Sequence, residues 1–181
     1  MQGSIYTALA DMVVEQMGII KWNELLAQTR PASGGVYTSG EQYEDSELVN
    51  ILILLAKEKN IPLEQAVQGF GEYLFKKLYD TSPVDVSKLD NLKDFLLAID
   101  KVIHGEVKRL HPNAYLPKFE YRQENPQTLI MYYSSKRKLC HASVGLILGA
   151  AKQFNETIAI THPECMHQGA SRCKLVIHFK D

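Results

Sequence analysis

The stretch that decides the fold is TLIMYYSSKRKL, residues 128–139. Side chains alternate between the two faces of an extended strand. One face would therefore begin with apolar side chains and end in two hydroxyl groups and a guanidinium. An ordinary half-buried strand directs such polar groups to the opposite face, toward water. The pattern predicts a strand whose inner face ends at a group that accepts hydrogen bonds. The residues of this face are Leu129, Met131, Tyr133, Ser135 and Arg137.

Three further strands are predicted around this one. KFEYRQEN (118–125) precedes it and would form a hairpin with it, whereas ETIAITH (156–162) and CKLVIHFK (173–180) follow it. HASVGLILGAAKQF (141–154) reads as a helix between them. Before residue 111 the apolar side chains recur at helical spacing. We therefore predict an α+β protein, with a helical N-terminal subdomain packed on a C-terminal subdomain that has a roughly four-stranded antiparallel sheet and helices.

The helical part ends in one long helix, predicted from about Leu92 to Leu110. Its apolar residues form a stripe at helical spacing. His104 lies in this helix, roughly 120° around the axis from the centre of the stripe. Taken alone, that position is more typical of an exposed or partly packed histidine than of a ligand. The residues of the stripe are Leu92, Phe95, Leu96, Ile99, Ile103, Val107 and Leu110.

Composition excludes several classes of function. The chain has 181 residues, 45% of them hydrophobic, and a formal net charge of -1 with dispersed basic residues, which argues against nucleic acid as a partner. We find no apolar run of about 20 residues for a membrane span and no basic leader, so we expect a cytoplasmic protein. We find no carboxylate pair, nucleophile–base motif or phosphate loop, which argues against an enzyme.

The donors of Tyr133, Ser135 and Arg137 suit one or two carboxylates that lack their own water. A ligand with paired carboxylates and a large apolar plane would satisfy both ends of that strand face. Heme is such a ligand, and it needs an axial base. A heme-free module that binds a small carboxylate is the alternative for these three residues.

The sequence resembles the heme nitric oxide/oxygen binding (H-NOX) family, the sensor module of bacterial gas sensors and of animal soluble guanylate cyclases. The resemblance rests on His104, on Pro117 in HPNAYLPKF, on the three donors above, and on the segments MQGSIY and FGEYLF. It implies one domain over residues 1–181, with a distal part (1–65), a proximal part (66–181) and heme b between them. It implies these roles: His104 binds the iron, Tyr133, Ser135 and Arg137 hold the propionates, and Pro117, Ile5 and Phe70 line the porphyrin.

The resemblance also implies which gases the protein binds. Oxygen-binding members have a distal tyrosine that donates a hydrogen bond to the bound gas, at a place that falls on Ala142 here. A methyl group cannot donate, His141 should point about 100° away, and the other distal candidates are apolar: Leu9, Phe70 and Leu146. We therefore predict a sensor with nitric oxide and CO as ligands, which weaken or break the bond between iron and His104. The output would be a separate histidine kinase or cyclic-dinucleotide enzyme.

The three cysteines of the chain lie in or beside the predicted sheet. Three thiolates and one imidazole suit a closed, tetrahedral zinc site. Oxidation of the thiols would release the metal, which makes a zinc–thiolate redox sensor a second hypothesis. His167 competes with His162 as the imidazole ligand, and three unrelated buried or surface thiols are the simpler alternative. The candidate ligands are Cys140, His162, Cys165 and Cys173.

Overall fold

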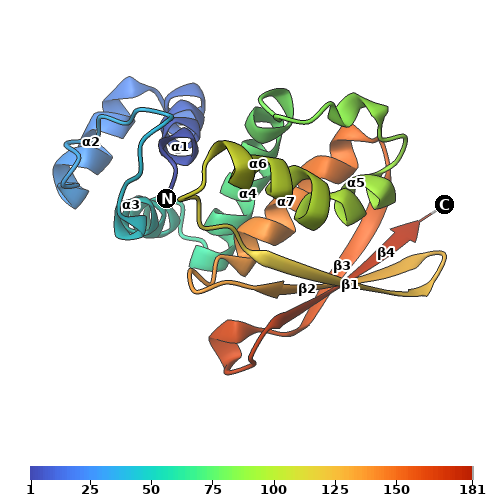
Figure 1. The fold of residues 1–181 in the computed structure, drawn as a ribbon. Helices are drawn as coiled ribbons and strands as arrows, with labels where there is room; N and C mark the ends of the chain where they lie inside the picture. The colour runs from blue at the N-terminus through green and yellow to red at the C-terminus, as the bar shows by residue number, and fades with distance from the viewer. Residues whose placement is uncertain (181) are drawn as a thin grey trace.

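The computed structural model describes residues 1–180. Helices cover one face of a four-stranded sheet, and the first three helices lie beside this pair of layers (Figure 1). The predicted α+β architecture is confirmed. Within residues 1–180, no helix is both long and apolar enough to cross a membrane. The helices are α1 (Gly3–Met17), α2 (Ile19–Thr29), α3 (Asp45–Glu58), α4 (Leu63–Asp80), α5 (Leu92–Ala98), α6 (His104–Leu110) and α7 (Cys140–Gln153), and the strands are β1 (Lys118–Asn125), β2 (Thr128–Ser134), β3 (Thr157–Glu164) and β4 (Cys173–Lys180).

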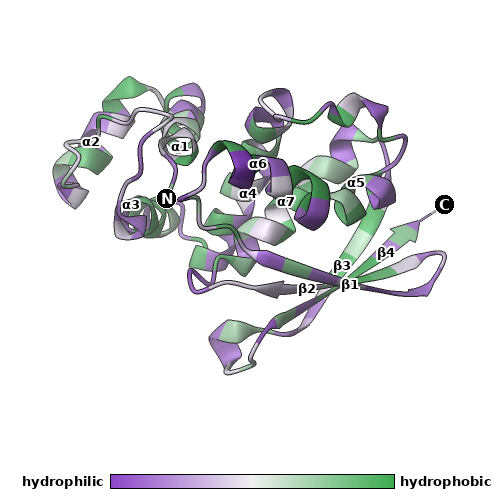
Figure 2. Cartoon of the chain, in the orientation of Figure 1, coloured by the Kyte–Doolittle hydropathy of each residue, from purple (hydrophilic) through white to green (hydrophobic). Residues whose placement is uncertain are grey.

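The sheet has the order β1-β2-β4-β3, and every neighbouring pair is antiparallel. Leu129, Met131 and Tyr133 of β2 are buried, as the alternation predicts. The tip of the β1–β2 hairpin is hydrophilic (Figure 2). However, β2 ends at Ser134, so the expectation that Ser135 and Arg137 continue the strand face is wrong. Both residues lie in the turn that follows the strand.

The long helix is helical from Leu92 to Leu110, but it contains a π turn (Ile99–Ile103) between α5 and α6. A π turn holds one residue more than an α turn, so every residue after it lags by roughly 100° around the axis. A regular α-helix would place His104 to the side of the apolar stripe. Because of the lag, His104 instead lies close to the inner face of the helix. Leu110, which the pattern placed in the stripe, lines the cavity described below but is 47% exposed.

The core consists of two clusters that share α4. The N-terminal cluster joins α1 to α4 and includes Trp22 and Phe70, whereas the second begins at Phe75 and joins α4, α5 and α7 to the sheet. The division into residues 1–65 and 66–181 stays a prediction, because α4 packs in both clusters. Glycines let α4 and α7 approach closely: a Cβ at Gly71 would lie 2.2 Å from the Ala142 carbonyl oxygen.

The loop over residues 30–44 is fixed to the N-terminal helices. The buried carboxylate of Glu47 accepts hydrogen bonds from the backbone N–H and the hydroxyl of Ser33 and from the hydroxyl of Tyr37. The Tyr37 ring stacks on the Tyr6 ring with 4.7 Å between centroids. The Gly3 N–H donates to the Glu41 carbonyl, which closes the loop over the start of α1.

Candidate functional site

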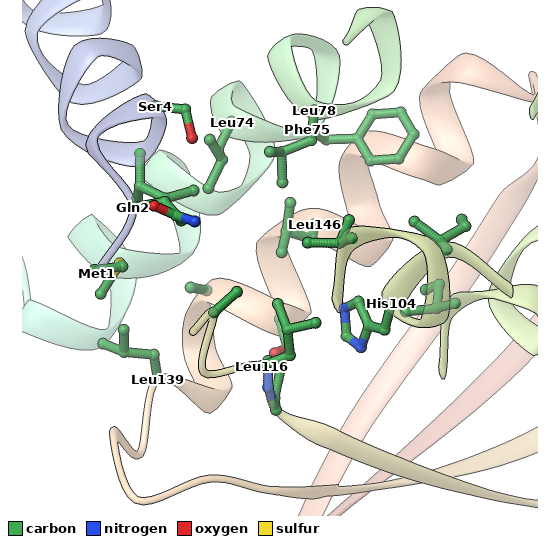
Figure 3. Close-up of a pocket in the computed structure, with 18 of the residues that line it drawn as sticks. Met1, Gln2, Ser4, Leu74, Phe75, Leu78, His104, Leu116, Leu139 and Leu146 are labelled. Carbon is green, nitrogen blue, oxygen red and sulfur yellow. The ribbon is translucent and has the colours of Figure 1, made fainter. Parts of the chain in front are cut away.

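A cavity of about 590 Å³ lies between the two core clusters. Side chains from α1, α4, α6, α7 and the turn after β2 line it, and Figure 3 shows His104, Leu74 and Leu146 directed toward the same space. Leu9, a distal candidate from the sequence, is instead fully buried in the N-terminal cluster. The structure thus brings together all nine residues predicted to bind the cofactor. They are Ile5, Phe70, His104, Pro117, Tyr133, Ser135, Arg137, Ala142 and Leu146.

His104 is the first residue of α6 and follows the π turn directly. Its Nδ1 atom is buried and has no hydrogen-bond partner in the described part of the chain. Burial lowers the pKa of His104, although the Asp100 carboxylate and the Pro117 carbonyl oppose this shift. The imidazole is therefore neutral near pH 7, which is the form that coordinates iron. A neutral ring whose buried Nδ1 has no partner, in a cavity lined mainly by apolar side chains, fits an axial ligand of heme.

The hydroxyl groups of Tyr133 and Ser135 are arranged as donors. The Tyr133 oxygen accepts a hydrogen bond from the Leu139 N–H at 2.9 Å, and the Ser135 oxygen accepts one from the Arg137 N–H at 3.2 Å. The Ser135 hydroxyl also hydrogen-bonds the Tyr133 hydroxyl. In this pair the Tyr133 hydroxyl can donate its proton to an outside acceptor. Burial raises the pKa of Tyr133 to about 12, so its proton is retained. Both groups fit a carboxylate that ends an apolar ligand.

The guanidinium of Arg137 lines the cavity and also forms hydrogen bonds to other residues of the protein. Its Nε donates to the Asp45 carboxylate at 2.6 Å, and its Nη1 donates to the Tyr115 carbonyl at 2.6 Å. The group also lies over the Tyr115 ring, 4.8 Å from the centroid. Three of its five N–H donors, one on Nη1 and two on Nη2, remain for a carboxylate. Asp45 could not be predicted as a partner of Arg137, because it lies 92 residues away in the sequence and no motif singles it out.

The distal residues Ile5, Phe70, Ala142 and Leu146 have hydrocarbon side chains, whereas the polar side chains of Gln2 and Ser4 line the cavity near the start of α1 (Figure 3). His141 does not join these residues. Its ring centroid lies 5.5 Å from that of His162 and 5.8 Å from that of His167, on the side of the cysteines. The rotation expected between neighbouring positions of a helix accounts for this placement.

The four predicted zinc ligands form a second candidate site. One donor atom from each of Cys140, His162, Cys165 and Cys173 lies within 4.8 Å of the others, and the three cysteines are buried. β4 lies between β2 and β3 in the sheet, and its Cys173 pairs with Tyr133 of β2. The His162 Nε2 is buried and has no partner among the described residues, so His162 belongs to this set and His167 does not.

The cysteine thiols lie in an environment that disfavours a lone thiolate. Burial and the neighbouring thiols raise the pKa of Cys140. Burial also raises the pKa of Cys173, and the Sγ atoms of Cys140 and Cys165 are 3.8 Å apart. Without a cation the side chains of Cys140 and Cys173 are protonated thiols, and a bound dication would stabilise their thiolates.

Comparison with known proteins agrees with this geometry. The family model described as "Haem-NO-binding" matches residues 2–162. The H-NOX protein from S. oneidensis in the Fe(II)NO state is 38% identical, with a TM-score of 0.94 and 100% of both chains covered. The unliganded Fe(II) H-NOX protein from K. algicida is 26% identical, with a TM-score of 0.90, and the match covers 100% of this chain and 97% of that one. The chain therefore belongs to the H-NOX family of heme-based gas sensors.

Proposed function

We propose that this protein is a non-enzymatic, cytoplasmic sensor of nitric oxide that regulates a separate signalling protein. One observation carries the proposal: the neutral imidazole of His104, whose buried Nδ1 has no partner among the described residues, lines the same cavity as the hydrocarbon side chains of Ile5, Phe70, Ala142 and Leu146. A ferrous heme held by His104, Tyr133, Ser135 and Arg137 would supply the binding of nitric oxide and CO. The family argues against a heme-free carboxylate module, and a Soret band in the purified protein tests that point.

Gas selectivity depends on the side chain at Ala142. Bound O₂ carries partial negative charge and gains from a hydrogen-bond donor, which Ala142, Ile5, Phe70 and Leu146 lack. The ferrous protein should bind nitric oxide and CO and form no lasting oxygen complex in air. Ala142→Tyr should lengthen the life of the oxygen complex at least tenfold, whereas Ala142→Phe, which lacks the hydroxyl, should not. A stable oxygen spectrum in the parent protein would refute the proposal.

The output is proposed to run through the helix that carries His104. The Asp100 carboxylate accepts a hydrogen bond from the Phe119 N–H at 2.9 Å and so fastens the π turn to β1. His104 would hold the heme iron, and a weaker bond between them in the presence of nitric oxide would leave this segment free to move. That movement would change the surface offered to a histidine kinase or cyclic-dinucleotide enzyme. Amide hydrogen exchange over 99–110 should be faster with nitric oxide than with CO. Equal exchange with both gases would contradict this route.

A second candidate function is a zinc–thiolate redox sensor. The four donors within 4.8 Å favour it. Protein purified without chelator should hold zinc at this set and release it on treatment with peroxide, because an oxidised thiol binds zinc poorly. If no zinc is found and all three thiols titrate freely in the native protein, the cysteines are ordinary buried residues and do not form a zinc site.

A further inference from the structure

The cysteine cluster holds more ligands than one zinc ion uses. Beside the four residues of the inner set, which are Cys140, His162, Cys165 and Cys173, a second group consists of Cys140, His141 and His167. One donor atom from each member of this group lies within 4.8 Å of the others. A structural zinc takes four ligands and has no open position. The imidazoles of His141 and His167 are therefore not accounted for by the inner set.

We infer that Cys140, His141 and His167 form an outer metal site, which shares the Cys140 sulfur with the inner set and takes a thiophilic ion, Zn²⁺ or Cu⁺. Cys140 is buried, His141 is half-buried and His167 is exposed, so the site opens from the cluster to solvent. Sulfur and imidazole are the ligands that both ions prefer. A water molecule from this open side can complete the coordination of zinc.

Local backbone geometry orients the ligands of the outer site. Cys140 and His141 begin α7, and His167 lies in the short 3₁₀ turn Met166–Gln168. The His167 Nε2 lies 2.7 Å from the carbonyl oxygen of Lys138. A backbone carbonyl accepts only from a protonated nitrogen, so Nε2 carries the proton and Nδ1 keeps its lone pair. Ligating histidines are commonly fixed by such a hydrogen bond on the other ring nitrogen.

Charge favours a second cation next to the inner one. A Zn²⁺ ion with three thiolates leaves one net negative charge among buried sulfur atoms, and a buried net charge is unfavourable. A cation bound to Cys140 from the solvent side would offset it, with the two imidazoles as neutral ligands. The Cys140 thiol proton passes to solvent when the metal binds.

Metal stoichiometry of the heme-loaded protein tests the outer site. The protein is equilibrated with excess Zn²⁺ or, without oxygen, with Cu⁺, and gel filtration and elemental analysis then give ions per chain. His141→Gln/His167→Gln should hold one ion fewer per chain than the parent protein in at least one of the two arms. The single change His167→Gln, at an exposed position, should release that ion to a chelator at least tenfold faster. His178→Gln, an exposed histidine on β4, is the matched control and should equal the parent.

A further variant separates this inference from the zinc–thiolate proposal. Cys165→Ser/Cys173→Ser removes the inner set but leaves the outer one, so this variant should still bind one ion and lose it when His141→Gln/His167→Gln is added. Loss of ions only with the inner cysteines, with the double histidine variant equal to the parent in both arms, would overturn the outer site. An unchanged Soret band in each variant shows that the chain has folded.

Discussion

The direction of the His104 side chain and its protonation state are set by its surroundings in the fold, namely by the π turn before it and by its burial. Its place off the apolar stripe is unremarkable in the sequence, and only the resemblance to a family singled it out. In the structure it is neutral because burial lowers its pKa, and it lies in the cavity because the π turn rotates it inward. Tyr133 was predictable from strand alternation alone, since β2 extends past it.

His104→Gly should remove the axial ligand without filling the cavity. We expect at least a tenfold loss of bound heme, and recovery when imidazole is supplied in solution, because the space left by the side chain admits the free ring. Absorbance of the Soret band against protein concentration measures both effects. His178→Gln serves as control. Heme content and gas spectra that equal those of the parent without imidazole would exclude His104 as the ligand.

At the scale of elements, local patterns predicted the type of each helix and strand but not their irregularities. The periods of apolar residues follow from local geometry, which is why β1 and β4 appear with the bounds that were expected. A π turn has no comparable code, because it depends on how the helix packs on β1. The turn that ends β2 at Ser134 is likewise set by tertiary contacts, among them Arg137 with Asp45.

The π turn predicts opposite effects on heme binding for a one-residue deletion and a one-residue insertion within it. Lys101 is exposed within it, so deleting Lys101 should convert the segment to a regular α-helix and keep His104 directed into the cavity. Insertion of one alanine after Lys101 should rotate His104 out by roughly 100° and abolish heme binding. Heme content of the two variants is the measurement. If both bind heme like the parent, the π turn does not set the direction of His104.

The contact between α4 and α7 is predicted to be intolerant of a single methyl group. A Cβ at Gly71 would lie 2.2 Å from the Ala142 carbonyl oxygen, so Gly71→Ala should force the helices apart and cost about 1–3 kcal/mol of unfolding free energy. Gly69→Ala is the matched control on the same helix. Its Cβ would meet nothing within 4 Å, and it should stabilise by about 0.5–1 kcal/mol. Urea unfolding midpoints distinguish the two, and a neutral Gly71→Ala would show that the contact adjusts freely.

At the scale of the whole molecule, long-range pairs join the two core clusters. Asp45 begins α3 beside the N-terminal cluster, and Arg137 follows β2, which belongs to the other cluster. The Met1 ammonium also pairs with the Asp45 carboxylate, at 3.0 Å. Sequence patterns cannot show such pairs, because they join residues that only the complete fold brings together. The four-residue cysteine set was predictable as a set because each of its members is a strong metal ligand.

Asp45→Asn tests the tie between the clusters through its pH dependence. Burial alone would raise the pKa of Asp45, but Arg137 and the N-terminal ammonium outweigh it and lower the pKa. The stabilisation is then complete above the unfolded value of about 3.9 and is lost as the pH falls through the lower folded value. Asp45→Asn should cost about 1 kcal/mol at pH 7, a modest value because the carboxylate is partly exposed. The difference from the parent should vanish near pH 2.

Thermal unfolding of the two proteins between pH 2 and 7 measures this difference. Asp11→Asn, which removes a pair with Lys77 on the exposed surface, should change stability by less than about 0.5 kcal/mol over the same range. A difference between parent and Asp45→Asn that stays constant down to pH 2 would exclude the ion pair as its cause.

The N-terminal cluster contains the one tryptophan of the chain, Trp22, which is 6% exposed. Tryptophan emission of the protein therefore originates entirely from the N-terminal cluster. Heme absorbs in the wavelength range in which tryptophan emits, so a porphyrin in the neighbouring cavity would quench this emission by resonance energy transfer. The intrinsic fluorescence of Trp22 would therefore report how much cofactor is bound. Stopped-flow fluorescence could follow heme loss without any added dye.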